Sequence, residues 1–311
     1  MCCLYGLLDT KHILSGKQKS KMLSVLATEC EARGTDATGI AYNSNGALRI
    51  YKRPWPARYM RFRVPTDAQA IMGHTRLTTQ GSEKRNYNNH PFEGRTKDGA
   101  FALAHNGVLY NDITLRRTLK LPKTKIETDS YIAVQLIEQQ KSLRPDSLKY
   151  MAETVEGSFT FTVMDEKDNL YFVKEDSPLC LVYFPRSGLY LYASTKEILF
   201  RAMQKMKLPA EKMVEIEISS GEILRIDRAG MMSTTCFDDA KLYRAWYRGW
   251  EFCPYQSYGT RQDSEYIQEL KAVAATFGYT PESIDRMLRM GMYPEEIEEF
   301  LYEQEAALCE C

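Results

Sequence analysis

Four short apolar segments follow one another closely in the middle of the chain, and they limit the possible folds more than any other feature. They are Ser158–Met164, Leu170–Lys174, Cys180–Phe184 and Leu189–Ala193. Turn-forming residues stand between them, notably Asp, Asn, Pro, Ser and Gly. Each segment is therefore predicted to be a strand that ends at a turn, and the chain is predicted to build its core from sheets.

Further strands and helices are expected on both sides of this run. Apolar segments predict strands at Cys3–Asp9, Gly39–Tyr42, Leu48–Tyr51, Ala70–His74 and Ala100–Ala104, and a hairpin of Met213–Ile218 with Glu222–Ile226. Helical spacing predicts helices at Gly16–Ala32, Asp129–Lys141, Asp146–Val155 and Thr195–Lys205. Strand runs flanked by helices predict an α+β fold, with two sheets packed face to face and helices outside.

One polar segment, Thr78–Gly99, is too long to be a simple connection within a compact domain. Loops of this length are usually functional or disordered. The sequence also changes character after about residue 230, so a domain of residues 1–230 and an extension of residues 231–311 are predicted. The extension begins as an aromatic linker and continues as three short helices, expected at Ser264–Phe277, Pro281–Met290 and Pro294–Glu305.

Charge and hydropathy exclude several classes of protein. Lys plus Arg and Asp plus Glu both total 41, and this balance argues against a nucleic-acid partner. No apolar run approaches the roughly 20 residues that span a bilayer, and no export signal is recognisable. The chain is therefore expected to be cytoplasmic, with no membrane contact and with reduced cysteines. Cys309 and Cys311 lack a nearby second pair of ligands, so neither a metal nor a cofactor is expected.

Cys2 is a candidate nucleophile because of its place in the chain. Removal of Met1 by methionine aminopeptidase would leave a thiol and a free α-amino group on one residue. An α-amino group has a pKa of roughly 7.7–8.0, which suits it to accept the thiol proton near neutral pH. Many proteins carry a small residue at position two, so this signal is weak when taken alone.

The tripeptide His105-Asn106-Gly107 directly follows the apolar run Ala100–Ala104. Attack on an amide creates an oxyanion, and an Asn side chain with a Gly backbone N–H can supply two donors to it. Glycine also lets the backbone approach a substrate closely. A plain turn after a strand fits the tripeptide equally well.

Two charged residues could bind a zwitterionic substrate. Arg76 stands two residues after the predicted strand Ala70–His74. A guanidinium at the end of a buried strand can bind a carboxylate with two hydrogen bonds. A structural ion pair is the commoner role of such an arginine. Asp129 stands at a predicted helix start. There it could hold an ammonium group, or it could simply complement the helix dipole beside Thr128 as N-cap.

Together these segments resemble the class II glutamine amidotransferase domain, a branch of the N-terminal nucleophile (Ntn) hydrolases. The family's Met-Cys-Gly start is similar to Met1-Cys2-Cys3, and its Arg-Gly-x-Asp-Ser-x-Gly segment to the seven residues Arg33 to Gly39. Its Gly-His-Thr-Arg-x-x-Thr motif resembles Gly73 to Thr79. His105-Asn106-Gly107 and Thr128-Asp129-Ser130 follow in the family's order, with a weaker likeness at Asn89-His90-Pro91-Phe92.

The resemblance implies a four-layer αββα sandwich with a small C-terminal helical extension. It implies that Cys2 is the nucleophile, with Asn106 and the Gly107 N–H as the oxyanion hole. The residues that it places in the binding of glutamine are Arg76 and Thr79 for the α-carboxylate, Asp129 for the α-ammonium group, and His105. The residues that it implies as supports are Arg33, Asp36, His74 and His90.

The implied activity is hydrolysis of the γ-amide of L-glutamine through a thioester on Cys2, with release of ammonia. Cys3 stands where the family has Gly, and Gln80 stands where some relatives have His. Residues 231–311 contain no Gly-rich phosphate loop and are too few for a sugar isomerase or phosphoribosyltransferase domain. The expected partner is therefore a separate ammonia-acceptor enzyme, such as an ATP-dependent ligase. The alternatives are an Ntn amidase with another amide substrate, and a catalytically silent scaffold protein with the same fold.

Overall fold

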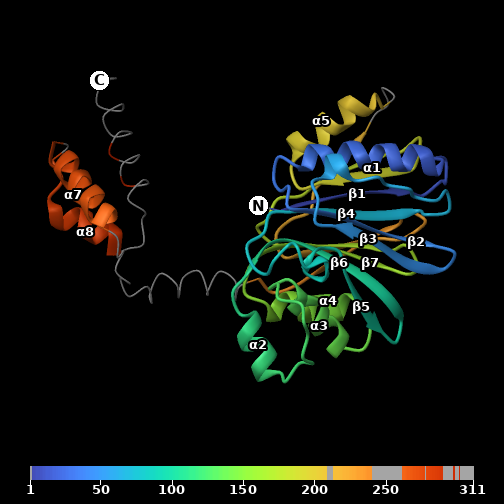
Figure 1. Cartoon of the computed structure of the whole chain (residues 1–311), viewed down its shortest axis with the longest axis horizontal. Helices are drawn as coiled ribbons and strands as arrows, with labels where there is room; N and C mark the ends of the chain where they lie inside the picture. Colours follow the sequence, from blue (N-terminus) through green and yellow to red (C-terminus); the bar gives the residue numbers. More distant parts are fainter. Residues whose placement is uncertain are drawn as a thin grey trace. The chain divides into compact units, whose positions relative to one another are not determined.

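The computed structural model describes residues 2–208, 213–239, 261–276 and 278–289, together with residues 297 and 301. Contacts within the chain divide it into two units, Met1–Lys241 and Leu242–Cys311. The first unit contains two sheets, whose paired strands all run antiparallel. This agrees with the predicted α+β architecture of two sheets and outer helices (Figure 1).

The first sheet has seven strands in the order β11-β9-β10-β1-β4-β2-β3. Their bounds are β1 Cys3–Asp9, β2 Ala37–Ser44, β3 Ala47–Arg53, β4 Ala70–Arg76, β9 Cys180–Phe184, β10 Leu189–Ala193 and β11 Val214–Ile216. The second sheet has six strands in the order β13-β12-β8-β7-β6-β5. Their bounds are β5 Phe92–Thr96, β6 Gly99–Leu109, β7 Gly157–Asp165, β8 Leu170–Lys174, β12 Glu222–Ile226 and β13 Met232–Cys236.

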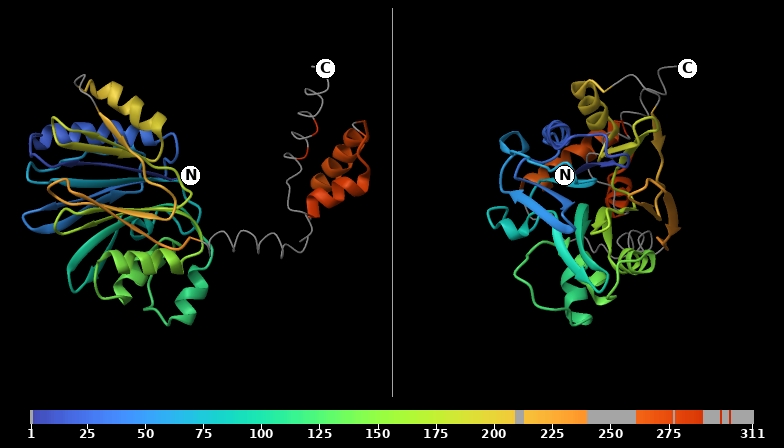
Figure 2. Two further views of the ribbon diagram at one scale, coloured as in Figure 1. Left: turned by 180° about the vertical axis from the view of Figure 1, so that it is seen from behind. Right: turned by 90° about the vertical axis from the view of Figure 1, so that its right-hand side faces the viewer.

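Helices cover the outer faces of both sheets, as the two views in Figure 2 also show. Helices α1 (Gly16–Cys30) and α5 (Lys196–Met206) lie on the first sheet, while α3 (Tyr131–Gln139) and α4 (Pro145–Thr154) lie on the second. The first unit also contains α2 (Asp112–Thr118) and the 3-10 turns η1 (Ala57–Tyr59) and η2 (Asn86–Asn88). Ser15 and Gln18 form a capping box that starts α1.

Strand β1 is buried on both faces, because it lies in the middle of the four layers. Its side chains alternate between two cores, as the period of a strand requires. Cys3, Tyr5 and Leu7 pack with residues of α1 and α5, whereas Leu4 and Leu8 pack between the sheets. The start of this central strand, directly after Cys2, is thereby fixed by packing on both sides.

The predicted hairpin of residues 213–218 with 222–226 is wrong. Strand β11 pairs with β9 at the edge of the first sheet, whereas β12 pairs with β8 and β13 in the second sheet. The turn residues at 219–221 carry the chain from one sheet to the other, and both partner strands offer backbone groups that need pairing. Leu224 and Ile226 of β12 thereby fill the core between the sheets.

Three further differences concern elements that the sequence patterns missed or misplaced. The polar segment 78–99 contains η2 and most of strand β5, so it is partly regular. Strand β13 pairs with β12 and brings residues beyond the predicted boundary at residue 230 into the second sheet. Helix α3 begins at Tyr131 and has Ser130, rather than Thr128, at its N-cap position.

The second unit contains helices α7 (Arg261–Thr276) and α8 (Pro281–Arg289), close to two of the three predicted helices. Leu270, Ala274 and Ile284 are buried in a small apolar core together with Ile297 and Leu301. The third predicted helix at 294–305 lies mostly outside the described residues, as do Cys309, Cys311 and most of the aromatic segment. No helix of the described part of the chain has both the length and the apolarity to cross a membrane.

Candidate active site

Cys2 lies at the point where the central strands of the first sheet end. Cys3 pairs with Thr75 of β4, so Cys2 stands beside the residues that follow β4. Its Sγ lies 3.5 Å from the carbonyl oxygen of Leu77, and its own carbonyl accepts a hydrogen bond of 2.9 Å from Arg33 Nε. The side chain is partly exposed. Arg33 thus holds the backbone of Cys2 in place.

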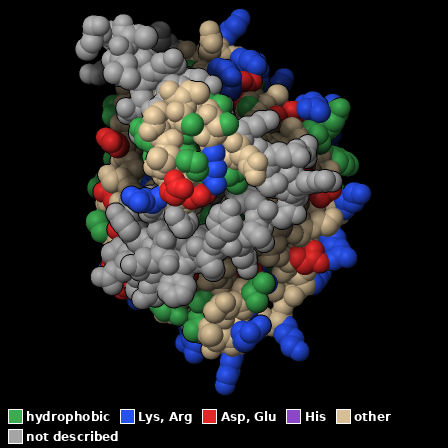
Figure 3. Space-filling model, turned by 90° about the vertical axis from the view of Figure 1, so that its left-hand side faces the viewer, with side chains coloured by type: hydrophobic (Ala, Val, Ile, Leu, Met, Phe, Trp, Pro, Cys, Tyr) green, Lys and Arg blue, Asp and Glu red, His purple; other side chains and the backbone are tan. Residues whose placement is uncertain are grey.

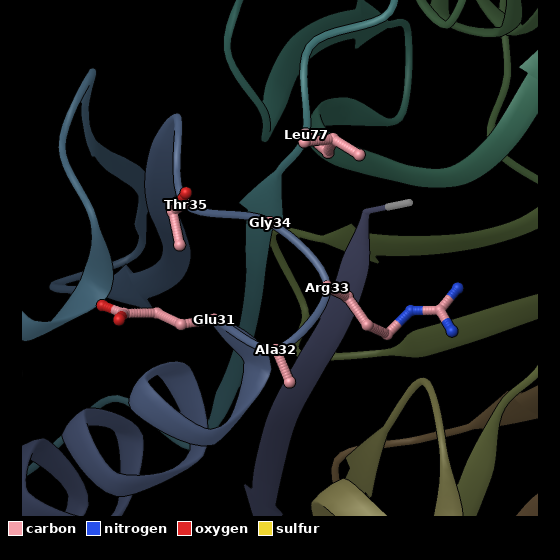
Figure 4. Close-up of a pocket in the computed structure, with 6 residues that line it drawn as sticks. All are labelled: Glu31, Ala32, Arg33, Gly34, Thr35 and Leu77. Atoms are coloured by element: carbon pink, nitrogen blue, oxygen red, sulfur yellow. The ribbon is translucent and has the colours of Figure 1, made fainter.

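A hollow of about 300 Å³ lies directly beside Cys2, lined by Glu31, Ala32, Arg33, Gly34, Thr35 and Leu77. Figure 4 shows Arg33 and Leu77 extending toward the same side, with the start of β1 between them. The turn after α1 supplies the other lining residues. A Cβ on Gly34 would lie 2.5 Å from the backbone carbon of Arg76, so only glycine lets this turn lie against the end of β4.

Asn106 reaches the same region from the second sheet. Its Nδ2 lies 3.5 Å from Ser194 Oγ, and this hydroxyl accepts a hydrogen bond of 2.8 Å from the backbone N–H of Leu4. Ser194 therefore connects β6 with the start of β1, two residues from Cys2. Because the contact to Asn106 is long for a hydrogen bond, the Asn106 amide keeps most of its capacity to donate to another acceptor.

Gly107 has a backbone conformation that other residues rarely adopt, with φ at 138°. A Cβ at this position would lie 2.0 Å from the carbonyl oxygen of Ser158 and 2.9 Å from His105 Nε2. The position therefore requires glycine on two independent grounds. The requirement for glycine here comes from the packing of Ser158 and His105, and the predicted close approach to a substrate stays a prediction.

Arg76 is almost fully buried, and the loop that follows β4 surrounds its guanidinium. Nη1 donates to Asn89 Oδ1 at 2.7 Å, and Nη2 donates to the carbonyl oxygens of Gln80 at 2.5 Å and Gly81 at 3.1 Å. These acceptors are neutral, so the positive charge of Arg76 has no carboxylate in contact among the described residues. A positioned guanidinium of this kind suits an anionic ligand.

Asp129 carries the opposite charge to Arg76 and is also buried. Its Oδ2 accepts a hydrogen bond of 2.7 Å from the backbone N–H of Leu109, at the end of β6. The Asp129 side chain therefore ties the end of a strand to the start of α3, beyond the dipole role that its position in sequence suggested. One lone-pair-bearing oxygen, Oδ1, has only a long contact of 3.4 Å from the Ser130 hydroxyl.

The charges of Arg76 and Asp129 both act on the Cys2 thiol. Burial raises the pKa of Cys2, the hydrogen bond to the Leu77 backbone and the positive charge of Arg76 lower it, and Asp129 raises it. The pKa of Arg76 is itself lowered by burial, and Cys2 and Asp129 are among the groups that oppose this shift. A thiol, a guanidinium and a carboxylate from three different segments therefore lie within electrostatic range of one another.

Three further predicted residues, Asp36, Thr79 and His105, lie on or near the segments that carry Arg76, Gly107 and Asp129. Asp36 supports the loop after β4, because its Oδ2 accepts a hydrogen bond of 2.7 Å from Thr78 N and its own N–H donates to Arg76 O at 2.9 Å. Thr79 is exposed on this loop. His105 was expected among the substrate-binding residues, and this role stays a prediction. Its ring is buried, with Nδ1 2.8 Å from Ser130 Oγ and the ring stacked on Phe161.

His74 and His90 lie deeper, in contact with each other at 4.2 Å between ring centroids. His74 Nε2 donates to the carbonyl oxygen of His105 at 2.9 Å. His90 packs on Phe92, and neither of its ring nitrogens has a hydrogen-bond partner among the described residues. Burial lowers the pKa of His74 to about 3 and also lowers the pKa of His90 and of His105. All three rings are therefore neutral supports.

These histidines make stability depend on pH. Below about pH 6.5 these histidines bind protons in the unfolded chain but stay neutral in the folded protein. The free energy of unfolding therefore falls as pH falls. His90→Phe removes one such group and keeps a ring between His74 and Phe92. We expect this variant to lose about 2 kcal/mol less stability than the wild type between pH 7 and pH 5, as measured by urea unfolding. Equal losses in the two proteins would contradict the assignment of His90 as a buried neutral base.

Sequence patterns missed several residues that shape this site. Ser194, Asn88, Asn89, Glu127 and Ser130 all make hydrogen bonds around Arg76, Asn106 or Asp129. A signal was present in the asparagine-rich run before His90, because asparagines in a polar loop often organise backbone turns.

Within the described ranges, no three His, Cys, Asp or Glu side chains lie together as metal ligands would. On the face drawn in Figure 3, Lys and Arg side chains are spread over separate places, with Asp and Glu between some of them.

Solved structures share this fold. The glutamine phosphoribosylpyrophosphate amidotransferase of B. subtilis aligns with a TM-score of 0.59 at 22% identity, over 76% of this chain and 49% of that one. A structure described as the allosteric regulatory enzyme of purine biosynthesis aligns with a TM-score of 0.61 at 20% identity, over the same shares of the two chains. The first unit thus has the fold of the Ntn amidotransferases.

Sequence comparison identifies the family. Residues 74–201 match the model of a family described as a glutamine amidotransferase domain. The glutamine–fructose-6-phosphate aminotransferase of Bacillus licheniformis is 30% identical over 236 residues, which are 70% of this chain and 37% of that protein. The enzyme of the same name from Listeria innocua is 31% identical over 193 residues, or 58% of this chain and 30% of that one. The chain therefore carries a class II glutamine amidotransferase domain, and it spans well under half the length of these relatives.

Proposed function

We propose that this domain hydrolyses the γ-amide of L-glutamine to glutamate and ammonia, with Cys2 as the nucleophile. The observations that carry the proposal are the position of Cys2 beside the end of β4, where Arg76 lies, and the charges of Arg76 and Asp129, which both act on the Cys2 thiol. Free glutamine carries an α-carboxylate and an α-ammonium group, and these two charges match Arg76 and Asp129. An amide substrate without both charges would leave a buried charge of the site without a partner, so this pair favours free glutamine over other amides.

The reaction begins once Met1 has been removed. The α-amino group of Cys2 takes the thiol proton, and the sulfur attacks the γ-carbonyl carbon of glutamine. Asn106 Nδ2 and the Gly107 N–H donate hydrogen bonds to the oxyanion. The proton passes to the leaving nitrogen as the C–N bond breaks, so that ammonia departs and a γ-glutamyl thioester remains on Cys2. Water then attacks the thioester, which gives glutamate and restores the thiol.

Two measurements test this proposal directly. Purified protein from its native host should release ammonia and glutamate from glutamine in equal amounts. Mass spectrometry of the same preparation should show Cys2 as the first residue. Protein that retains Met1 and yet hydrolyses glutamine would rule out the α-amino group as base.

The Arg76 guanidinium gives a more specific prediction. Arg76→Lys keeps the positive charge, but its three N–H donors cannot satisfy the three acceptors on the loop and a carboxylate at once. We expect KM for glutamine to rise about 10- to 100-fold, because charge-assisted hydrogen bonds of this kind contribute about 1.5–3 kcal/mol. Steady-state kinetics check this, and Arg49→Lys on the outer strand β3 serves as a control. An unchanged KM would show that Arg76 does not bind the carboxylate.

We further propose that the ammonia passes to a separate acceptor enzyme of the ATP-dependent ligase class. The proposal is supported by the aminotransferase and amidotransferase relatives, whose names describe transfer to an acceptor. The acceptor would bind through residues 240–311. Co-purification of a ligase with the full chain, lost when residues 240–311 are removed, would support this. Recovery of the ligase with the shortened chain would place its binding surface on the domain itself.

A further inference from the structure

The loop between β4 and β5 holds Arg76 from two sides. Gln80 and Gly81, at its beginning, accept hydrogen bonds from Nη2, and Asn89, near its end, accepts one from Nη1. Asn89 is fixed in turn, since its Nδ2 donates to the carbonyl oxygen of Glu83 at 2.8 Å. The position of the guanidinium therefore follows the position of this loop, residues 77–91.

The same loop is fastened to Glu127 at three points. Asn88 Nδ2 donates to Glu127 Oε2 at 2.7 Å, the Glu127 N–H donates back to Asn88 Oδ1 at 3.0 Å, and Gln80 Nε2 donates to Glu127 O at 3.0 Å. Asn88 has no exposed surface. We call the reciprocal pair of hydrogen bonds between Asn88 and Glu127 the Asn88–Glu127 clasp.

The backbone of Gly81 packs closely against the side chains of Asn88 and Glu127. A Cβ on Gly81 would lie 3.0 Å from Glu127 Cβ and 3.1 Å from Asn88 Nδ2, so the backbone of residue 81 rests directly on the pair. Arg85 adds an ion pair to Glu127 on the solvent side. The residue that accepts a hydrogen bond from Arg76 is thus in contact with the clasp itself.

Glu127 lies two residues before Asp129. Asp129 is held from the other side by its hydrogen bond from Leu109 N. Together with the hydrogen bond from Gln80 and the ion pair from Arg85, the clasp therefore connects the loop that holds the Arg76 guanidinium with the segment that carries the Asp129 carboxylate. We propose that Asn88 and Glu127 are positioning residues that set the separation of Arg76 from Asp129, and that they thereby make the site selective for a free α-amino acid.

The physical reason lies in the substrate. The α-carboxylate and α-ammonium groups of an amino acid are bonded to one carbon, so both can be bound only if their two partners stand at one fixed separation. Small misplacements in a bound substrate are costly to catalysis. A substrate with only one of the charges makes no such demand, because it can shift toward its single partner. The inference rests on the proposed glutamine site and adds what determines its selectivity.

Asn88→Asp is the sharpest test. The side chains have the same shape, but the variant loses the Nδ2 donor and places a carboxylate against that of Glu127. We expect KM for glutamine to rise about tenfold or more while kcat changes less than about threefold. The kcat/KM values for glutaramate, which lacks the α-amino group, and for 4-aminobutanamide, which lacks the α-carboxylate, should change less than about threefold.

Matched variants separate this role from general damage. Glu127→Gln keeps a side-chain oxygen for Asn88 Nδ2 and the same backbone, so we expect nearly the KM of the wild type. Glu93→Gln removes a carboxylate from an exposed ion pair with Arg95 and serves as the control. If glutamine and both analogues lose kcat/KM by the same factor in Asn88→Asp, the clasp only supports the fold and the proposal is overturned.

Binding separates the clasp from the proposed function. Calorimetric titration of Cys2→Ala with glutamine and with glutaramate measures selectivity without turnover. A loss of selectivity on adding Asn88→Asp supports the clasp even if the wild type releases no ammonia, which would overturn only the proposed hydrolysis. Selectivity that is the same with and without Asn88→Asp overturns the clasp even if the wild type is active. Absence of glutamine binding to Cys2→Ala overturns both.

Discussion

Cys2→Ala is expected to abolish the release of ammonia from glutamine, with a fall in kcat of more than about 10³-fold. The physical reason is that the substitution removes the sulfur atom that is proposed to form the thioester, and loss of a nucleophile is among the most damaging single changes to an enzyme of this type. Binding of glutamine should survive, because Arg76 and Asp129 remain. A coupled assay for glutamate, with mass spectrometry for the missing thioester, measures both parts of the prediction.

The neighbouring cysteine provides the matched control. Cys3 is fully buried in the core beneath α1, and its Sγ lies 3.5 Å from the carbonyl oxygen of Leu4. Cys3→Ala should cost some stability through the small cavity that it leaves, yet kcat should stay within about threefold of the wild type. Hydrolysis that survives Cys2→Ala but is lost in Cys3→Ala would indicate that Cys3 is the nucleophile, and it would contradict the mechanism.

Local patterns predicted the layers of this fold well, and the failures have a common cause. Strand β10 is apolar along its whole length, and β1 is apolar up to its last residue, Asp9, because both strands are covered on both faces. Their sequences are therefore easy to interpret. Strand β13 has mostly exposed side chains and so lacks an apolar run. Its place is decided by backbone pairing with β12, which no local pattern encodes.

The wrong hairpin shows the same limit from another side. The turn at residues 219–221 is real, but a turn alone does not choose which sheet edge a strand will join. Two open edges, at β9 and at β8, each gain a partner when β11 and β12 separate. That choice depends on contacts between residues far apart in sequence, and a reading of adjacent residues cannot reach it.

The residues of the candidate site also fall into those that the sequence could predict and those that only the structure reveals. Cys2, Arg76, Asn106, Gly107 and Asp129 stand in short motifs whose order resembles one family, so they could be named before any geometry was known. Asn88 and Glu127 could not, because each looks like an ordinary polar loop residue until the hydrogen bonds between them are seen. His105 stands in the same motif as Asn106 and Gly107, and the sequence could not show that its ring would contact Ser130 and Phe161.

The second large effect is expected at Asn106, where the side-chain amide is the proposed donor to the oxyanion. Asn106→Ala should lower kcat about 10²- to 10³-fold with little change in KM, because the donor acts on charge that develops only in the transition state. Asn106→Asp should be at least as damaging, since a carboxylate of nearly the same shape would repel the oxyanion. Steady-state kinetics with glutamine, together with thermal melting of each variant, provide the measurement.

Asn43 is the control that decides what a fall in kcat means. It is a buried asparagine like Asn106, but its Nδ2 donates to the carbonyl oxygen of Asp165 at 2.7 Å and to the Asp168 carboxylate at 3.0 Å, so its capacity is already used. Asn43→Ala should therefore lower the melting temperature and leave kcat nearly unchanged. If instead both alanine variants lower kcat in proportion to their loss of stability, Asn106 is a structural asparagine. The oxyanion would then need another donor besides the Gly107 N–H, and the Ser194 hydroxyl, 3.5 Å from Asn106 Nδ2, would be the first candidate to replace it.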